Sequence, residues 1–371
     1  SSRGTFQIQF SQTEARMLIE AVTECEPLAV APGIFFVFRD KIAEQRFLTG
    51  RSRGARDISK LLAISPPATE PATSREQALV EEHRELIDAL WERSLELGRL
   101  PVPEELDEVV LEGIEQVFGS VRKTARLAER VHDAETLTTA RAARIEDLRV
   151  YFALNLFNQR RRYRELPDDL RRDIKAFFGS QTNAETAGRE LLFSLGEAET
   201  ISEACCVAAA AGLGYLFEDH SLQLHASLVP RLPAALRAYV GCAEKMYGDI
   251  SGETVDLVKI HIHSGKLTVQ RYDDFFGKPL PSLLERVKIK LRGQDIDVFD
   301  HAAGELAPVL TMKSRYMATD QTGYAKQKRF DKALADLPGI DFSGYGPSTQ
   351  ELNTAFFASG LKCRGWKLVS V

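Results

Sequence analysis

The chain has 371 residues, of which 44% are hydrophobic and 27% charged, so it is long enough for two or three domains that each bury a core. Its five cysteines include no C-x-x-C pair, so the sequence indicates neither a disulfide framework nor a structural metal site. Its longest nearly uncharged stretch, 204–217, falls short of the ~20 residues that a membrane-spanning helix needs. The net charge of −5 is uneven, from −10 over 76–115 to +5 over both 122–175 and 259–292, and therefore does not exclude a nucleic-acid partner.

The first fifty residues are predicted to form a helix and then a buried strand. Ser11 and Glu14 fit a capping box, which predicts a helix over about 12–23. The apolar run 34–38, Ile-Phe-Phe-Val-Phe, is typical of a strand buried on both faces. We therefore expect 1–50 to be the closing unit of an α/β sheet whose other strands lie outside this sequence, and the start at Ser1 to be a cut from a longer protein.

The next segments are predicted to be a linker and a helical domain. Arginine, glycine, serine and proline give 51–74 linker character, and apolar residues recur at helical spacing from 75 to 213. The spacing predicts helices over 79–97, 106–118, 121–131, 135–159, 167–178, 184–195 and 200–213, with Gly179 and Gly196 as stops.

Beyond Gly214 the apolar residues recur at every second position instead of every 3.6 residues. Strands are expected over 258–262, 267–269, 287–291, 295–298 and 366–371, with a turn at Ser264-Gly265. Residues 214–371 are thus predicted to hold a small antiparallel sheet with helices. The fold class is predicted to be α+β and predominantly helical, with an N-terminal remnant of an α/β sheet.

Lys259, His261 and His263 form the strongest constellation, because a period of two places all three on one face of a strand. Two histidines could ligate a metal ion if a third ligand came from elsewhere. A phosphate-contacting face that Lys288 and Lys290 extend is a second interpretation. A solvated sheet face is the third and is favoured. In it, lysines of one strand pair across a hairpin with aspartates: Lys288 and Lys290 with Asp295 and Asp297.

Two basic clusters are candidates for nucleic-acid contact. The first follows a predicted helix and consists of Arg160, Arg161, Arg162, Arg171 and Lys175. The second interleaves tyrosines with cations and consists of Lys313, Arg315, Lys326, Lys328 and Arg329. Aromatic rings among basic residues suit stacking against bases. For the first cluster, docking on the acidic segment 76–115 is the alternative, and arginines at a helix end also stabilise the helix dipole.

No complete catalytic signature is present. The sequence has no phosphate-binding loop, nucleophile elbow, H-E-x-x-H motif or dinucleotide-binding glycine pattern, and Gly212-Leu213-Gly214 is predicted to be a turn. Asp273 and Asp274 could serve metal-assisted chemistry, but adjacent residues of an extended segment point in opposite directions, so a turn with aspartate caps is favoured. A metal-dependent nuclease that uses His261 and His263 is the weakest functional hypothesis.

Several segments of the chain resemble the methyltransferases associated with DNA phosphorothioation (Dnd) systems, and the resemblance runs along nearly the whole chain. The segments are Arg3-Gly4-Thr5-Phe6-Gln7, 31–40, 166–170, 173–179, and 258–261 with 272–275. The most specific is 173–179, Asp-Ile-Lys-Ala-Phe-Phe-Gly. The chain departs from the family at Thr311-Met312-Lys313, where members carry His-Arg-Lys, and at Asp273, where members carry proline.

The resemblance implies a role in DNA modification. In that family a class I methyltransferase domain, which binds S-adenosylmethionine, precedes a segment like this one. Its glycine-rich cofactor loop has no counterpart here. The resemblance therefore implies that 1–50 closes the methyltransferase-like domain, that this chain holds no cofactor and is inactive alone, and that S-adenosylmethionine binds the full-length protein.

Two hypotheses about partners follow. The first is a non-catalytic, DNA-engaging or scaffolding region of a cytoplasmic modification enzyme, with DNA as partner and no membrane contact. The second is a protein-interaction module that docks a partner of the same defence complex through its acidic helices, in which case reversing Glu81, Glu85 and Asp88 would abolish docking.

Overall fold

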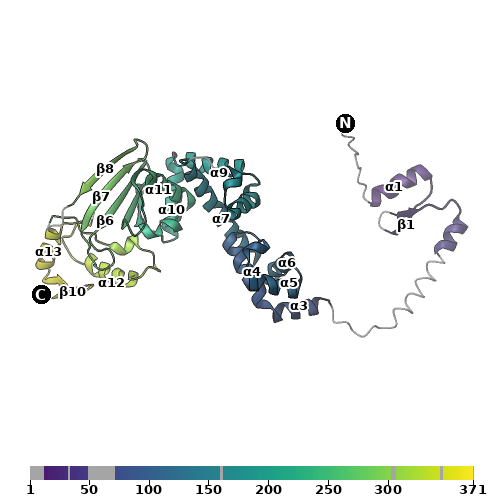
Figure 1. Cartoon of the computed structure of the whole chain (residues 1–371), viewed down its shortest axis with the longest axis horizontal. Helices are drawn as coiled ribbons and strands as arrows, with labels where there is room; N and C mark the ends of the chain where they lie inside the picture. Colours follow the sequence, from purple (N-terminus) through teal and green to yellow (C-terminus); the bar gives the residue numbers. More distant parts are fainter. Residues whose placement is uncertain are drawn as a thin grey trace. The chain divides into compact units, whose positions relative to one another are not determined.

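The computed structural model describes residues 12–31, 34–48, 72–158, 162–301, 306–342 and 346–370, and the chain divides into two compact units, Ser1–His83 and Arg84–Val371 (Figure 1). Across the described residues, no helix combines the length and the apolar character that a membrane span requires. Most of the expected linker lies outside these residues. Its last three residues, 72–74, are not linker but the start of a helix, α3 (Ala72–Glu82).

The first unit contains a small hairpin rather than an unpaired strand. Helix α1 (Gln12–Thr23) is followed by β1 (Leu28–Ala31), which pairs antiparallel with β2 (Ile34–Phe36). The predicted strand 34–38 is thus shorter than expected and finds its partner within this chain, because the apolar run at 28–31 supplies one. Phe36 is 43% exposed and contacts Phe47 edge-on, so the strand is not buried on both faces. Membership of a methyltransferase-like domain stays a prediction.

The second unit begins with a helical part. Its helices are α4 (Arg84–Leu97), α5 (Glu108–Phe118), α6 (Val121–Val131), α7 (Ala134–Asn155), α8 (Asp168–Asp173), α9 (Gln181–Ser194) and α10 (Ala198–Ala210). Short polar side chains cap several of them: Ser120 accepts a hydrogen bond from the Lys123 N–H, and Asp133 from the Glu135 N–H. The expected helix 79–97 is interrupted at His83, and the expected helix 167–178 becomes a π-helix over Ile174–Phe178.

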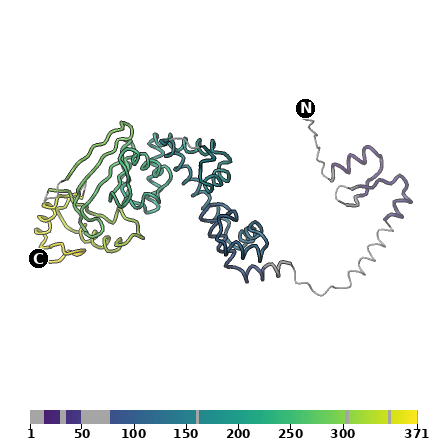
Figure 2. Tube along the Cα trace, in the orientation of Figure 1, coloured from purple at the N-terminus to yellow at the C-terminus, as the bar shows by residue number. Residues whose placement is uncertain are grey.

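Helices α7 and α9 cross closely because α9 presents a glycine at the contact. A Cβ atom at Gly188 would lie 2.6 Å from the Phe152 Cβ atom and 2.7 Å from the Ala153 backbone. Helix α7 also packs against α11 (Ala234–Tyr247). Figure 2 follows the chain from this helical part into the sheet that comes next. The two parts of the second unit are therefore joined through packed helices.

A six-stranded antiparallel sheet forms the centre of the second unit. Its strands pair in chain order: β3 (Tyr215–Phe217), β4 (Ser221–His225), β5 (Leu257–His261), β6 (Lys266–Tyr272), β7 (Leu283–Lys290) and β8 (Asp295–Asp300). Helices α10 and α11 cover one face (Figure 1), where Leu222, Ile260 and Leu267 lie in the main hydrophobic core. The antiparallel sheet and its alternation confirm the α+β prediction.

The C-terminal segment adds helices and a hairpin beside the sheet. These are α12 (Tyr324–Ala335), α13 (Thr349–Ala358), β9 (Leu361–Cys363) and β10 (Leu368–Ser370). Phe330 and Leu334 of α12 pack with Leu352 and Phe356 of α13 in a separate core. The last strand was predicted over 366–371; of its described residues, 368–370 form β10, which pairs with β9, and 366–367 are not strand.

Candidate nucleic-acid interface

The Lys259, His261 and His263 trio does not share one face. Lys259 and His261 alternate with core residues, so they lie on the sheet face opposite α10 and α11. His263 lies beyond the end of β5, where it is exposed and its Nε2 is 2.9 Å from the Asp219 carbonyl oxygen. The one-face prediction is therefore wrong for His263, because the strand ends before that residue.

The two remaining residues of the trio are partly buried rather than free at the surface. Burial lowers the pKa of His261 to about 4, and Nε2 of this ring lies 3.0 Å from the Thr268 hydroxyl. Burial, and then the charge of Lys288, also lowers the pKa of Lys259. In the described part of the chain, no three His, Cys, Asp or Glu side chains gather to hold a metal ion, so the nuclease hypothesis has no metal centre there.

The lysines of β7 are partnered within the sheet. Lys290 lies opposite Asp295, and its ammonium is 2.9 Å from Asp295 and 2.8 Å from Asp297. Lys288 lies opposite Asp297 in the register, and its ammonium is 5.3 Å from the centre of the Phe299 ring. The register that the solvated-face interpretation required is confirmed. Lys290 is neutralised by two carboxylates and has little charge left for a phosphate.

The first basic cluster is only partly available. Arg160 and Arg161 lie outside the described residues. Arg162 and Lys175 are exposed, whereas Arg171 forms an ion pair with Asp168 of the same helix. Of the exposed members, Arg162 directly precedes the 3₁₀ turn Tyr163–Glu165 and Lys175 lies in the π-helix, so the described members belong to different local elements.

The same segment does meet the acidic region, through neighbouring residues. Arg172 lies 3.6 Å from Glu104 and 3.5 Å from Glu105. Arg99 pairs with both Glu105 and Asp173 at 2.7 Å, and all three side chains are less than a tenth exposed. Arg99 holds the pKa of Glu105 down at about 2. Docking of the basic segment on the acidic one is therefore intramolecular here.

Lys313 is not a surface residue. Its side chain is 2% exposed, and its ammonium donates hydrogen bonds to the carbonyl oxygens of Phe275 and, at 2.5 Å, of Lys278. Burial lowers its pKa to about 8. The loop 273–278 is shaped by Asp273 and Asp274, which accept hydrogen bonds from the Ser282 and Gly277 N–H groups as turn caps. The predicted nucleic-acid contact is wrong for Lys313, because this loop encloses the ammonium.

A hollow that is lined by four cations lies between α12 and the C-terminal hairpin. We call it the basic hollow. Its volume is about 730 Å³, and its lining residues are Lys326, Arg329, Phe330, Ala333, Arg364, Gly365, Trp366, Lys367 and Leu368. No carboxylate lines it, and within the described ranges none of its four cations forms an ion pair. It therefore presents concentrated positive charge.

An aromatic side chain organises the basic hollow. The Lys326 ammonium lies 3.6 Å from the centre of the Trp366 ring. The indole N–H of Trp366 donates a 3.1 Å hydrogen bond to Gln327, whose amide in turn donates to Asp331 and to the Pro279 carbonyl. This chain of hydrogen bonds fixes the ring beneath the cation.

The sequence analysis identified two of the four cations of the basic hollow. Lys326 and Arg329 were candidates, but Arg364, Trp366 and Lys367 were not. A signal for them was present, since Arg364-Gly365-Trp366-Lys367 places two cations around a glycine turn, with the Arg364 N–H bonded to the Lys367 carbonyl. That these residues face α12 depends on tertiary packing.

Two other candidates lie outside the basic hollow. Lys328 is exposed on α12, with its ammonium 5.5 Å from the centre of the Tyr324 ring. Arg315 is exposed in the 3₁₀ turn Lys313–Tyr316, with its guanidinium 5.0 Å from the centre of the Tyr215 ring. The predicted neighbour is found for Lys328, whereas the ring beside Arg315 is Tyr215 and not the interleaved Tyr316. Neither cation belongs to the basic hollow.

The basic hollow brings four cations together, and no carboxylate is among its lining residues. Four donors around a fixed indole can bind phosphates by charge, and they offer no nucleophile or general base. Comparison with protein-family models, curated proteins and solved structures gives no match to this chain.

Proposed function

We propose that the chain is a non-catalytic region that engages DNA and that the basic hollow is its contact with the phosphate backbone. The observation that carries this proposal is the convergence of Lys326, Arg329, Arg364 and Lys367 on one hollow that no carboxylate lines. Such charge binds phosphates by releasing condensed counterions. The partner is DNA, and no base-specific contact is part of the proposal.

We further propose that the full-length protein is a methyltransferase that serves DNA phosphorothioate modification or restriction. This rests on the sequence resemblance alone, above all on Asp-Ile-Lys-Ala-Phe-Phe-Gly at 173–179. In this proposal S-adenosylmethionine binds a domain outside this chain. The residues described here bind and position the DNA.

The first test is the salt dependence of DNA binding. Fluorescence anisotropy with a duplex of about 20 base pairs measures the affinity at several salt concentrations. Each neutralised phosphate contributes about −0.9 to the slope of log K against log salt, so four contacts lower the affinity about 100-fold between 50 and 200 mM salt. Absence of binding at about 50 mM salt would refute the proposal.

Paired substitutions locate the contact. Arg364→Gln and Lys367→Gln together should weaken binding at every sequence tested and reduce the magnitude of the salt slope by about 2. Lys328→Gln and Lys332→Gln together are the matched control, because they remove two exposed cations from α12 without touching the lining of the hollow. Equal losses in the control and in the Arg364 and Lys367 variant would show that general positive charge, and not the hollow, binds DNA.

A further inference from the structure

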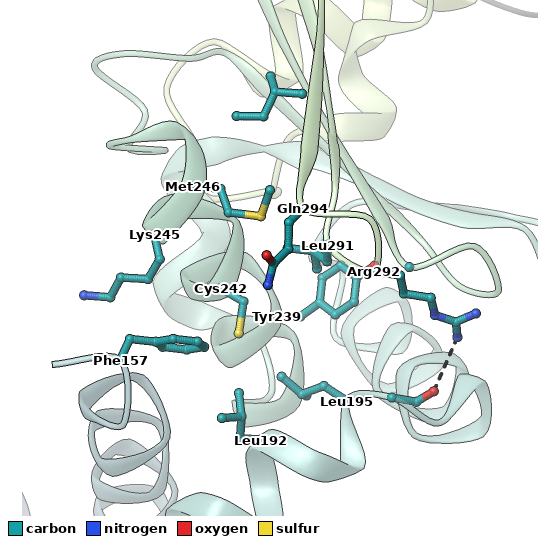
Figure 3. A pocket seen from close by; sticks show the side chains of 13 residues that line it. Phe157, Leu192, Leu195, Tyr239, Cys242, Lys245, Met246, Leu291, Arg292 and Gln294 are labelled. Atoms are coloured by element: carbon teal, nitrogen blue, oxygen red, sulfur yellow. Dashed lines mark hydrogen bonds between the residues drawn. The ribbon is translucent and has the colours of Figure 1, made fainter.

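A second cavity, which shares no lining residue with the basic hollow, lies where the helical part meets the sheet (Figure 3). Its volume is about 620 Å³, within the range of sites that hold small organic molecules. Apolar side chains from three elements form most of its wall: Leu192 from α9, Cys242 and Met246 from α11, and Leu291 and Ile296 from the β7–β8 hairpin. Phe157, which is 52% exposed, closes one side.

The polar groups deep in the cavity wall either already form a hydrogen bond or carry no charge. The Tyr239 hydroxyl donates a 3.2 Å hydrogen bond to the Lys266 carbonyl, so the tyrosine offers the cavity its ring. Burial raises the pKa of the Cys242 thiol to about 11, so the thiol stays protonated at neutral pH. The cavity wall is therefore mostly apolar, and its thiol is protonated rather than an ionised nucleophile.

One rim carries an oriented cation. Arg292 donates a single long hydrogen bond, 3.4 Å, to the Gly196 carbonyl oxygen. Its side chain crosses the β5–β6 turn at Gly265, where a Cβ atom would lie 2.8 Å from the Arg292 Cγ atom. The absence of a side chain at Gly265 thus lets the arginine lie over the cavity edge. Its remaining guanidinium donors have no carboxylate acceptor in the described lining.

A strained residue next to this arginine supplies an amide. Gln294 has a φ of 51°, a left-handed conformation that costs energy for a residue with a Cβ atom. Figure 3 shows its amide directed toward Cys242 and the cavity interior. Lys245 lies at the opposite rim with its ammonium directed outward. The lining thus combines an apolar wall, an amide and cations, and contains no acid.

We propose that this cavity is a binding site for a small organic anion with an apolar body. The body packs between Leu195, Phe157 and the wall of α11, and its carboxylate, sulfonate or phosphate group binds the Arg292 guanidinium, whose forked donors match such oxygens. Gln294 donates a further hydrogen bond from its amide. This site is independent of the DNA contact, so either proposal can fail alone.

Two fluorescent probes that differ by one sulfonate group test the proposal on the full chain. They are 8-anilinonaphthalene-1-sulfonate and its uncharged analogue N-phenyl-1-naphthylamine. We expect saturable 1:1 binding of the sulfonate, about tenfold tighter than that of the neutral probe, because a hydrogen-bonded charge adds about this factor. Arg292→Gln should remove the difference between the probes, while Arg126→Gln, an exposed change on α6, should leave it intact.

A cavity-filling variant tests the location. Cys242→Phe places a ring in the cavity and should abolish binding of both probes, whereas Cys206→Phe adds the same ring to the exposed surface of α10 and should have no effect. Thermal unfolding checks that both variants fold. If Cys242→Phe fails to fold, Arg292→Gln alone decides the question. Equal affinity of the two probes for the unaltered protein, or binding that survives in folded Cys242→Phe, would overturn the proposal.

Discussion

His225 is a titratable residue buried without a charged partner. It is 1% exposed, and the centre of its ring lies 4.6 Å from that of Phe275. Its Nδ1 accepts a 3.2 Å hydrogen bond from the Ser227 N–H, while Nε2 has no partner among the described residues. Burial, and then the nearby charge of Lys313, lowers the pKa of His225 to about 4. The imidazole is therefore neutral at physiological pH.

This neutral imidazole makes stability depend on pH. Because the pKa in the folded state lies below the unfolded value of about 6.5, the unfolded chain binds more protons between pH 6.5 and 4. The stability that the neutral His225 imidazole contributes is fully present above pH 6.5. It is lost as the pH falls to 4, by up to about 3 kcal/mol. His225→Asn keeps an acceptor for the Ser227 N–H and should remove this share, as measured by urea unfolding at pH 7 and pH 4.5.

The control for this prediction is an exposed histidine. The His263 side chain is 58% exposed, so His263→Asn should give a stability curve against pH that runs parallel to that of the unaltered chain. If His225→Asn also runs parallel, the imidazole of His225 is not the source of the acid sensitivity.

At the level of single residues, the sequence predicts the cross-strand pairs that follow from the alternation of residues along a strand. It misses the contacts that a side chain makes with a loop far away in the sequence. Lys288 and Lys290 fall opposite Asp297 and Asp295 because alternation and hairpin register determine both strands at once. The enclosure of Lys313 depends on carbonyl groups 35 and 38 residues away. No local pattern around Lys313 distinguishes such a lysine from an exposed one.

At the level of elements, a buried ionic network holds the helical part together. The Asp173 carboxylate accepts hydrogen bonds from Arg99 at 2.7 Å and from Arg144 at 2.7 Å, which links the segment after α4, and helix α7, to the end of α8. Removing the Asp173 charge leaves Arg144 without a carboxylate partner among the described residues and leaves Arg99 with Glu105 alone. Asp173→Asn should therefore destabilise the protein by about 3–5 kcal/mol, measured as the loss in free energy of unfolding in urea.

The matched control lies on the same helix. Asp168 is 70% exposed and pairs with Arg171, so Asp168→Asn should leave the unfolding midpoint unchanged, since exposed ion pairs contribute little. A loss of equal size in both variants would contradict the prediction, because the buried network would then contribute no more than an exposed ion pair.

Elements were predictable where the sequence carries end signals. The helix expected over 121–131 is confirmed because Ser120 caps α6 and a glycine precedes it. The break at His83 was missed, because the apolar spacing continues from Leu79 to Leu86 with no proline or glycine between them. The pairing of β1 with β2 was missed because four residues of β1 are too few to show a period.

At the scale of the whole molecule, the predicted domain boundary and the packing differ. The sequence predicts separate domains at 75–213 and 214–371, because the apolar period changes at Gly214. The structure places both in one compact unit that begins at Arg84. Contact between α7 and α11 joins them: a Cβ atom at Gly241 of α11 would lie 2.5 Å from the Leu154 side chain. The spacing of apolar residues along the sequence does not show which helices pack against each other.

This joined packing predicts one cooperative unfolding transition for the second unit. The chain has two tryptophans, Trp91 in α4 and Trp366 beside β10, so each part carries its own fluorescent reporter. In Trp366→Phe the fluorescence follows the helical part, and in Trp91→Phe it follows the C-terminal part. Within each variant, the midpoint of urea unfolding by fluorescence should coincide with the midpoint by far-ultraviolet circular dichroism. Comparison within one variant cancels any stability that the substitution itself removes. Two separately folding domains would instead give fluorescence midpoints displaced from the circular dichroism midpoint in opposite directions in the two variants, which would restore the boundary at Gly214.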